Sequence, residues 1–324
     1  MGLWRRKAAR LAAALVLLCA PAAARADGWP TRPIRLIIPY AAGGPVDVAA
    51  RIVGDRLAER FRVSVLLDNR PGAGGNIGAE VVAKAAPDGY MLLFTTSSIT
   101  IAPSLYRALS YDLQRDLTPI GQILTQPTTL IALPDFPAST IPELIAMARR
   151  APGTLTFASG GNGTTNHLSG EMLKALAKID IVHVPYRGTA PAFTALMGGE
   201  VSMMFASTLE SMPLIKGGRV KPLAVTNAAR SPMLPDLPTI GEFVPGYECT
   251  IWYGMWAPTA LPADILAQLS QAVQALRDQP DVKARFDQFG ATLVAGTPAA
   301  LAEHVRAEVE KWAKLAAAAG IQPE

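Results

Sequence analysis

Apolar, strand-like runs alternate with helical segments along this chain, and this alternation restricts its fold more than any other feature. The first three runs are RLIIPY (35–40), VSVLLDN (63–69) and YMLLFTTS (90–97), and LTFAS, IVHVPY, VSMMFA and VKPLAVT follow after residue 154. Runs that are apolar at nearly every position suit strands that are covered by helices on both faces. The sequence therefore predicts the α/β class with largely parallel sheets.

A weak internal repeat indicates two lobes. The first set of runs ends at PDGYMLLFTTS and the second at VKPLAVTN, and each is followed by a proline-rich stretch and a further apolar run. Two similar lobes joined by two crossing strands would give this pattern, with a cleft between them where ligands prefer to bind. We expect residues 27–123 and 250–324 to form lobe one and residues 124–249 to form lobe two.

The first 26 residues have the three parts of a secretory signal peptide. A positively charged start precedes a short apolar core over residues 11–20, and a small-x-small site lies directly before Asp27. This core is far shorter than the roughly 20 residues that a membrane-spanning helix needs. Removal of residues 1–26 takes away five positive charges and no negative one, so that the formal charge of +4 becomes −1. An exported, nearly neutral protein is expected to bind no nucleic acid, and its lone Cys249 is expected to be a small core residue.

Three glycine-rich turns follow three of the expected strands. They are AAGGPVD (41–47), NRPGAGGNIG (69–78) and ASGGNGTTNH (158–167). In an open α/β sheet the loops at the carboxyl ends of strands bind ligands, and glycine allows the backbone to approach a ligand closely. No turn matches the phosphate-binding pattern of nucleotide-binding proteins. One such turn can be chain geometry alone, but three turns at one cleft favour a binding site.

The first of these turns contains no lysine or arginine. A helix N-terminus favours an anion, and backbone N–H groups form charge-assisted hydrogen bonds to an ionised acceptor. Together they can hold a carboxylate, whereas a multiply charged phosphate usually requires a cationic side chain or a metal ion. The sequence therefore predicts a small carboxylate ligand. Hydroxyl side chains near the same loops could donate to ligand oxygens or cap helices.

The three histidines are His167, His183 and His304, and they are too scattered in the sequence for a set of metal ligands. We expect His183 to be a hydrogen-bonded core residue and His304 to be exposed. A hydrolase built on Ser159 is an alternative, but the chain has no G-x-S-x-G motif. No enzymatic activity, metal or cofactor is predicted.

Several longer stretches resemble one protein family. They are WPTRPIRLIIPYAAGGPVDVAAR, NRPGAGGNIGAEVVAKAAPDGYMLL, PSLYRALSYDLQRDLTPIGQ, FASGGNGTTNHLSGEML, HVPYRGTAPA, LAVTNAARSPMLPDLPTIGE and WYGMWAP. In this order they are similar to the Bug-type periplasmic solute-binding proteins of tripartite tricarboxylate transporters. The resemblance implies a type II two-lobed fold that closes around a small carboxylate in the periplasm, and a monomer that delivers it to membrane permease subunits. A sensor subunit that docks to a signalling receptor would use the same chemistry and stays an alternative.

The resemblance also implies roles for residues of lobe one. The turn with Ala42, Gly43, Gly44 and Asp47 is similar to the family loop that holds one carboxylate by backbone N–H groups and ordered water. Tyr40 stands where the family has an aromatic wall. Because its own charge would repel a carboxylate, Asp47 is expected to orient the turn or its water.

Further ligand contacts are implied at strand ends and in lobe two. Thr95 and Ser97 resemble the strand-end contacts of lobe one, and Tyr186 and Arg187 match a pair at the cleft edge. The loop that meets the other end of the ligand is matched by Ser159, Gly163, Thr164 and His167.

One departure from the family pattern concerns the strand end after Phe205. The family often has an acidic or other polar residue there, whereas this chain has Ala206. A missing carboxylate would remove a partner for a ligand amine. This departure favours a plain or aromatic carboxylate over an amino acid.

Overall fold

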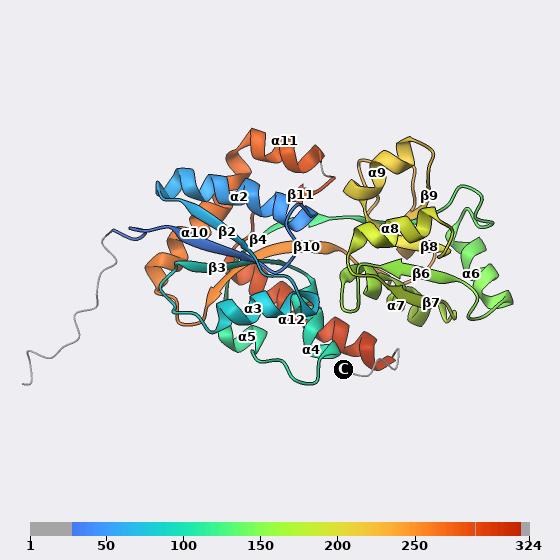
Figure 1. Ribbon diagram of the computed structural model, residues 1–324, viewed down its shortest axis with the longest axis horizontal. Helices are drawn as coiled ribbons and strands as arrows, with labels where there is room; N and C mark the ends of the chain where they lie inside the picture. The colour runs from blue at the N-terminus through green and yellow to red at the C-terminus, as the bar shows by residue number, and fades with distance from the viewer. Residues whose placement is uncertain (1–27, 289, 319–324) are drawn as a thin grey trace, which may run out of the picture.

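The computed structural model describes residues 28–288 and 290–318 and has two α/β lobes side by side (Figure 1). The expected signal peptide, residues 1–26, lies outside the described residues. In the part of the chain that the structure describes, no helix has both the length and the apolar composition to cross a membrane.

A six-stranded sheet forms the centre of lobe one, in the order β11-β4-β10-β3-β1-β2. Its strands are β1 (Ile34–Ile38), β2 (Val65–Asn69), β3 (Met91–Thr96), β4 (Leu117–Gln126), β10 (Ile251–Pro258) and β11 (Thr292–Leu293). A five-stranded sheet forms the centre of lobe two, in the order β7-β6-β8-β5-β9. Its strands are β5 (Thr128–Ala132), β6 (Thr156–Ser159), β7 (Val182–Pro185), β8 (Met203–Ser207) and β9 (Lys221–Val225).

The prediction of largely parallel sheets is wrong, because both sheets are mixed. Three strands of each lobe pair in parallel, namely β1 with β2 and β3, and β6 with β7 and β8. The strands that carry the chain between the lobes pair antiparallel, β10 with β3 and β4, and β5 with β8 and β9. A crossing strand enters the sheet from the opposite direction, so it cannot continue the parallel order.

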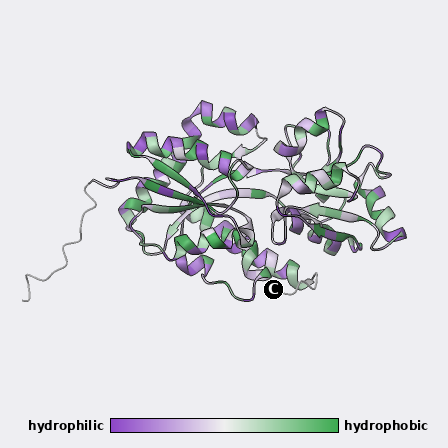
Figure 2. Cartoon of the chain, in the orientation of Figure 1, coloured by the Kyte–Doolittle hydropathy of each residue, from purple (hydrophilic) through white to green (hydrophobic). Residues whose placement is uncertain are grey.

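Helices cover both faces of each sheet. On lobe one, α2 (Pro45–Phe61), α10 (Ala263–Gln274) and α11 (Pro280–Gln288) cover one face, and α3 (Asn76–Ala83), α4 (Ser98–Leu105), α5 (Leu113–Asp116) and α12 (Pro298–Ala318) cover the other. On lobe two, α6 (Ile141–Arg150) and α7 (Thr165–Ala177) lie opposite α8 (Thr189–Met197) and α9 (Thr208–Lys216). Figure 2 shows the resulting pattern, with hydrophobic strands inside and hydrophilic segments along outer helices such as α11.

The two lobes share more than the crossing strands. β4 runs to Gln126 in the first sheet, three residues beyond the expected boundary at residue 123, and β5 begins in the second sheet after Pro127. The end of α12 also joins the core of lobe two, where Trp312 and Leu315 pack with Tyr247 and Cys249. Cys249 is fully buried, as expected for a small core residue. The C-terminal helix therefore packs against both lobes.

Candidate ligand-binding site

A cavity of about 610 Å³ lies between the lobes. One wall is formed by residues 40–46, which are the turn after β1 and the start of α2. The other wall comes from the residues that begin α7, α8 and α9. Gln126, Ile251 and Tyr253 of the crossing strands also line it, and the Tyr253 hydroxyl donates to Gln126 Oε1 at 2.8 Å. The cavity is therefore built from both lobes and from the strands that cross between them, which we call the hinge.

Five helices begin at this cavity. Their first-turn or N-cap residues in its lining are Pro45 of α2, Ser98 of α4, Thr165 of α7, Thr189 of α8 and Ser207 before α9. N–H groups in the first turn of a helix have no intrahelical partner, and the helix dipole favours an anion there. Among the described lining residues, Arg187 is the one lysine or arginine. The cavity thus suits an anion mainly through its backbone.

The turn of lobe one is held by Asp47 from behind. Gly43 has a left-handed φ of +81°, and its N–H donates to Asp47 Oδ2 at 2.9 Å. The carboxylate also accepts from Arg51 Nε at 3.0 Å and from Asn69 Nδ2 at 3.1 Å. Burial alone would raise the pKa of Asp47, but the hydrogen bonds from Gly43, Arg51 and Asn69 outweigh it and lower that pKa. Asp47 is only 1% exposed, so its charge is used inside lobe one and does not face the cavity.

A second turn with the same geometry lies in lobe two. Gly163 has a φ of +77°, and its N–H donates to His167 Nδ1 at 3.2 Å. Thr164 caps α7 by accepting from the N–H of His167, and its hydroxyl donates to the carbonyl of Gly161 at 2.8 Å. The proton of that hydroxyl is therefore already used within the turn.

Two histidines stack behind the second turn. The rings of His167 and His183 have centroids 4.0 Å apart, and His183 Nε2 lies 2.7 Å from Ser159 Oγ. Burial lowers the pKa of His167 to about 4 and that of His183 to about 3. Both rings are therefore neutral near pH 7. His183 is hydrogen-bonded as expected, and its contact with His167 was not predicted.

The contact between Ser159 and His183 does not form a hydrolytic site. Ser159 is fully buried and is absent from the lining of the cavity, and its hydroxyl also lies 3.1 Å from the carbonyl of Gly161. In the described part of the chain, His183 has no carboxylate partner that would complete a triad. No group of His, Cys, Asp and Glu among the described residues could hold a metal ion.

Six of the thirteen residues expected at the site line the cavity. They are Tyr40, Ala42, Gly43, Gly44, Thr164 and Arg187. Gly163 belongs to the second turn, and three others lie behind the two turns, namely Asp47, Ser159 and His167. Thr95 and Ser97 are buried, and Ser97 Oγ lies 2.9 Å from Thr165 Oγ1 of the opposite lobe. Tyr186 packs among the side chains between α8 and the second sheet.

Glu210 is a lining residue that sequence reasoning missed. It lies in the first turn of α9, and its Oε1 accepts a hydrogen bond from Thr189 Oγ1 at 2.7 Å. Burial raises the pKa of Glu210, and no cationic side chain among the described residues pairs with it. This wall therefore has a carboxylate, although position 206 lacks one. The signal was present, because Glu210 lies one turn beyond the strand end at Ala206.

Comparison with known proteins identifies the family. Residues 49–321 match the family described as tripartite tricarboxylate transporter family receptor. The chain belongs to this receptor family. Its members are solute-binding proteins rather than enzymes.

Three solved structures are similar to this family member over most of their length. A protein of R. palustris with adipate is 37% identical, with a TM-score of 0.84 over 91% of this chain and 100% of that one. The periplasmic binding protein BugD is 37% identical, with a TM-score of 0.82 over 91% and 100%. MatC from Rhodopseudomonas palustris with bound malate is 32% identical, with a TM-score of 0.81 over 89% and 99%. The family implies a periplasmic location and the two-lobed fold described above.

Proposed function

We propose that this receptor captures a small organic carboxylate in the cleft between its lobes and delivers it to the permease subunits of a tripartite tricarboxylate-type transporter. The observation that carries the proposal is the convergence of five helix N-termini on a cavity whose described lining contains one cationic side chain. Backbone N–H groups and helix dipoles together hold a carboxylate at such a site. The adipate and malate bound by two similar proteins support this ligand class.

The two walls would bind different parts of the ligand. One carboxylate would accept from the free first-turn N–H groups of α2, since the N–H of Gly43 is already used by Asp47. The other end would meet lobe two, where Arg187 and Glu210 line the same cavity. Buried carboxyl groups need hydrogen-bond partners. We therefore expect a dicarboxylate with a hydroxyl or amino group, which would donate to Glu210, to bind more tightly than a plain one.

We also propose that the receptor is exported to the periplasm. The positively charged start, the apolar core and the small-x-small site before Asp27 support cleavage after residue 26 and release into the periplasm. The receptor is proposed to act as a monomer. Mass spectrometry of the protein from a periplasmic extract should give a chain that begins at or near Asp27, and an intact N-terminus on that protein would contradict the proposal.

A thermal-shift screen tests the ligand class. The panel would contain malate, adipate, succinate and aspartate, with phosphate as an arm of different chemistry. A carboxylate at a hundredfold excess over its Kd should add about 2.7 kcal/mol of stability. Stabilisation by phosphate alone, or by none of the carboxylates, would contradict the proposal.

A deletion strain separates transport from sensing. Loss of uptake of the stabilising carboxylate supports the transport role. Normal uptake with lost induction by that carboxylate would support the alternative of a sensor subunit.

A further inference from the structure

A second pocket lies on the opposite side of the hinge from the cleft. Its volume is about 430 Å³, and its wall contains Thr125, Thr250 and Trp252, whereas Gln126, Ile251 and Tyr253 face the cleft. Successive side chains of a strand point to opposite faces, and the register pairs Trp252 with Thr125 and Ile251 with Gln126. The two cavities are therefore back to back on the crossing strands. We call the second one the hinge pocket.

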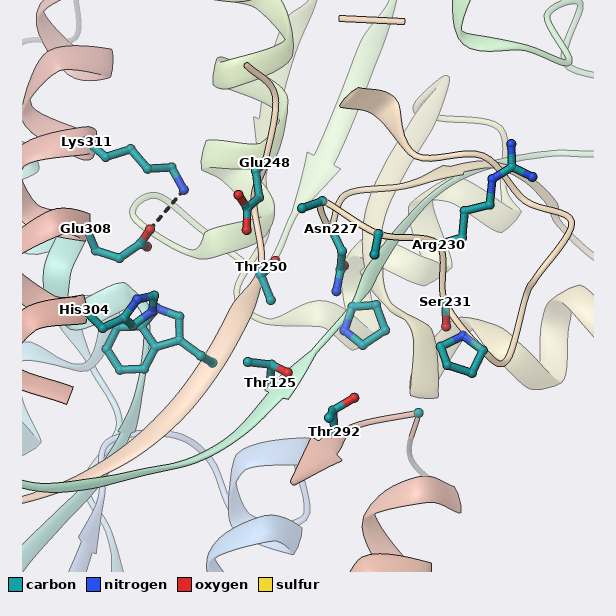
Figure 3. A pocket seen from close by; sticks show the side chains of 16 residues that line it. Thr125, Asn227, Arg230, Ser231, Glu248, Thr250, Thr292, His304, Glu308 and Lys311 are labelled. Carbon is teal, nitrogen blue, oxygen red and sulfur yellow. Dashed lines mark hydrogen bonds and ion pairs between the residues drawn. The ribbon is translucent and has the colours of Figure 1, made fainter. Parts of the chain in front are cut away.

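The hinge pocket is bounded by both lobes. Figure 3 shows His304, Glu308 and Lys311 of α12 on one side, and Asn227 with the loop that follows it on the other. The side chains of Thr250 and Thr125 lie between these two groups. A molecule in this pocket would contact the helix of lobe one, the loop of lobe two and the strands that cross between the lobes.

Three of the residues that line the hinge pocket carry a buried polar atom without a partner. They are Asn227 Oδ1, Trp252 Nε1 and His304 Nε2, and they are three of the seven such side-chain atoms in the described residues. Trp252 is only 1% exposed, and its ring meets that of His304 edge to face at a centroid distance of 5.0 Å. A buried polar group without a hydrogen bond costs roughly 1–3 kcal/mol. The concentration of such atoms at one pocket indicates an occupant that forms hydrogen bonds.

The charges around the hinge pocket favour a positive occupant. Glu308 is already paired with Lys311 at 3.0 Å, and its other oxygen accepts from Trp312 Nε1 at 2.9 Å. Arg230 is held by both oxygens of Glu242, at 2.9 and 2.7 Å, and points away from the pocket in Figure 3. Glu248 has no ion-pair partner among the described residues, so it leaves one uncompensated negative charge.

We propose that the hinge pocket binds a small polar amine that bridges the two lobes. Its ammonium group would donate to Glu248 and to Asn227 Oδ1. A hydroxyl group on the same molecule would accept from Trp252 Nε1 and donate to His304 Nε2. Burial lowers the pKa of His304, which keeps the ring neutral near pH 7 and free of repulsion towards a cation. The site is distinct from the cleft and has the opposite charge preference.

Occupation of the hinge pocket changes the affinity of the cleft for its carboxylate. The amine contacts both lobes and both crossing strands, so it binds one arrangement of the lobes better than another. Any carboxylate whose binding depends on that arrangement must then change its affinity, typically by 5–150-fold for coupled sites. The direction is set by which arrangement the amine prefers.

Titration calorimetry with ethanolamine and 1,4-diaminobutane tests the hinge pocket directly on the mature chain. His304→Phe on α12 should weaken amine binding about tenfold, because it removes a buried hydrogen-bonding atom. Glu248→Gln on the lobe-two side should weaken it a few-fold, because Glu248 is exposed. Ala229→Trp should fill the pocket and abolish binding. Glu303→Gln, at an exposed position of the same helix outside the lining, is the matched control and should bind as the unchanged protein does.

Three outcomes overturn the proposal. Binding of neither amine means that water alone fills the pocket. Binding that survives Glu248→Gln, His304→Phe and Ala229→Trp places the amine elsewhere. A malate or adipate affinity that saturating amine leaves unchanged removes the coupling to the cleft. The amine titration uses no carboxylate, so its result does not depend on whether the proposed ligand class of the cleft is correct.

Discussion

The two turns that face each other across the cleft have the same backbone design and different chemistry. In each, a glycine with φ near +80° donates its N–H to a side chain four residues later, in the first turn of the following helix. In lobe one the acceptor is Asp47, whose carboxylate pairs with Arg51 and accepts a hydrogen bond from Asn69. In lobe two the acceptor is His167, which is neutral and stacks on His183. Backbone geometry is thus shared, but the two turns depend differently on pH.

The two walls of the cleft also differ in the charged side chains that line them. Lobe one presents a glycine turn and the start of α2, and no charged side chain of lobe one lines the cavity among the residues that the structure describes. Lobe two adds Arg187 and Glu210 to its helix starts. We infer that lobe one binds the carboxylate that every ligand shares, and that lobe two selects among ligands by their other end.

The largest effect is expected from acidification, which should break the turn of lobe two and spare that of lobe one. The pKa of His167 is lowered from 6.5 to about 4. The neutral ring therefore stabilises the folded protein fully above pH 6.5, and this stabilisation is lost as pH falls towards 4. At about 1.4 kcal/mol per pKa unit, this loss approaches about 3 kcal/mol. The pKa of Asp47 is lowered below 3.8, so its contribution persists throughout this range.

Urea unfolding at about pH 7 and about pH 4.5 measures this difference. His167→Asn keeps an acceptor for the N–H of Gly163 but cannot gain a proton, so it should remove most of the pH dependence that His167 causes. An equal loss of unfolding free energy in the variant and the unchanged protein would show that His167 does not carry the effect.

The next largest effect is expected at the wall of the cleft that lobe two forms. Glu210→Gln should weaken binding of malate or aspartate by about tenfold, because a hydrogen bond to a charged group is stronger than one to an amide. Binding of succinate, which has no hydroxyl or amino group, should change little. Because burial raises the pKa of Glu210 and disfavours its charged form, the variant should be at least as stable as the unchanged protein at neutral pH.

Titration calorimetry with malate, aspartate and succinate compares Glu210→Gln with the unchanged protein. Glu200→Gln, which changes an exposed glutamate of lobe two away from the cavity, is the matched control. Equal losses for malate, aspartate and succinate would mean that Glu210 supports the fold of the wall and does not select the ligand.

The smallest effect is expected for Asp47→Asn. The amide oxygen can still accept from the N–H of Gly43, so the turn of lobe one should keep its shape. Affinity for the carboxylate should therefore fall less than about threefold, within the range of a weakened side-chain hydrogen bond. A loss of a hundredfold in calorimetry would show that the charge of Asp47, and not its hydrogen bond, is needed for binding.

Local patterns predicted the first turn well. The strand-to-helix sequence after residue 34 appears as β1 and α2, and the site of the turn follows from two glycines and a proline directly before the helical spacing begins. The expectation that Asp47 orients this turn agrees with its bond to Gly43. These features depend on residues that are neighbours in the sequence.

Features that depend on distant residues were not predictable in the same way. His167 and His183 are 16 positions apart and meet because β6 and β7 pair in parallel beneath α7. His304 was expected to be exposed, but it packs on Trp252 where β10 passes below α12, so that expectation is wrong. Glu210 reaches the cleft because α9 starts at its wall, which apolar periodicity does not indicate.

The central claim is that backbone N–H groups at the start of α2 hold the ligand carboxylate. Gly43→Val tests it, because a β-branched residue at a φ of +81° distorts the turn. Gly246→Val is the matched control. Gly246 has the same φ of +81°, a Cβ atom added at either glycine would meet open space, and Gly246 lies outside the cavity lining.

Calorimetry with malate and adipate on Gly43→Val, Gly246→Val and Arg187→Gln is the most direct measurement. Each lost charge-assisted hydrogen bond is worth roughly 1.5–3 kcal/mol, so Gly43→Val should raise Kd by about 10- to 150-fold. Gly246→Val should bind normally, and Arg187→Gln should lose only a few-fold, because an exposed ion pair contributes about 0.2–1 kcal/mol. Normal binding by Gly43→Val together with abolished binding by Arg187→Gln would contradict the account, because a side-chain cation would then hold the anion.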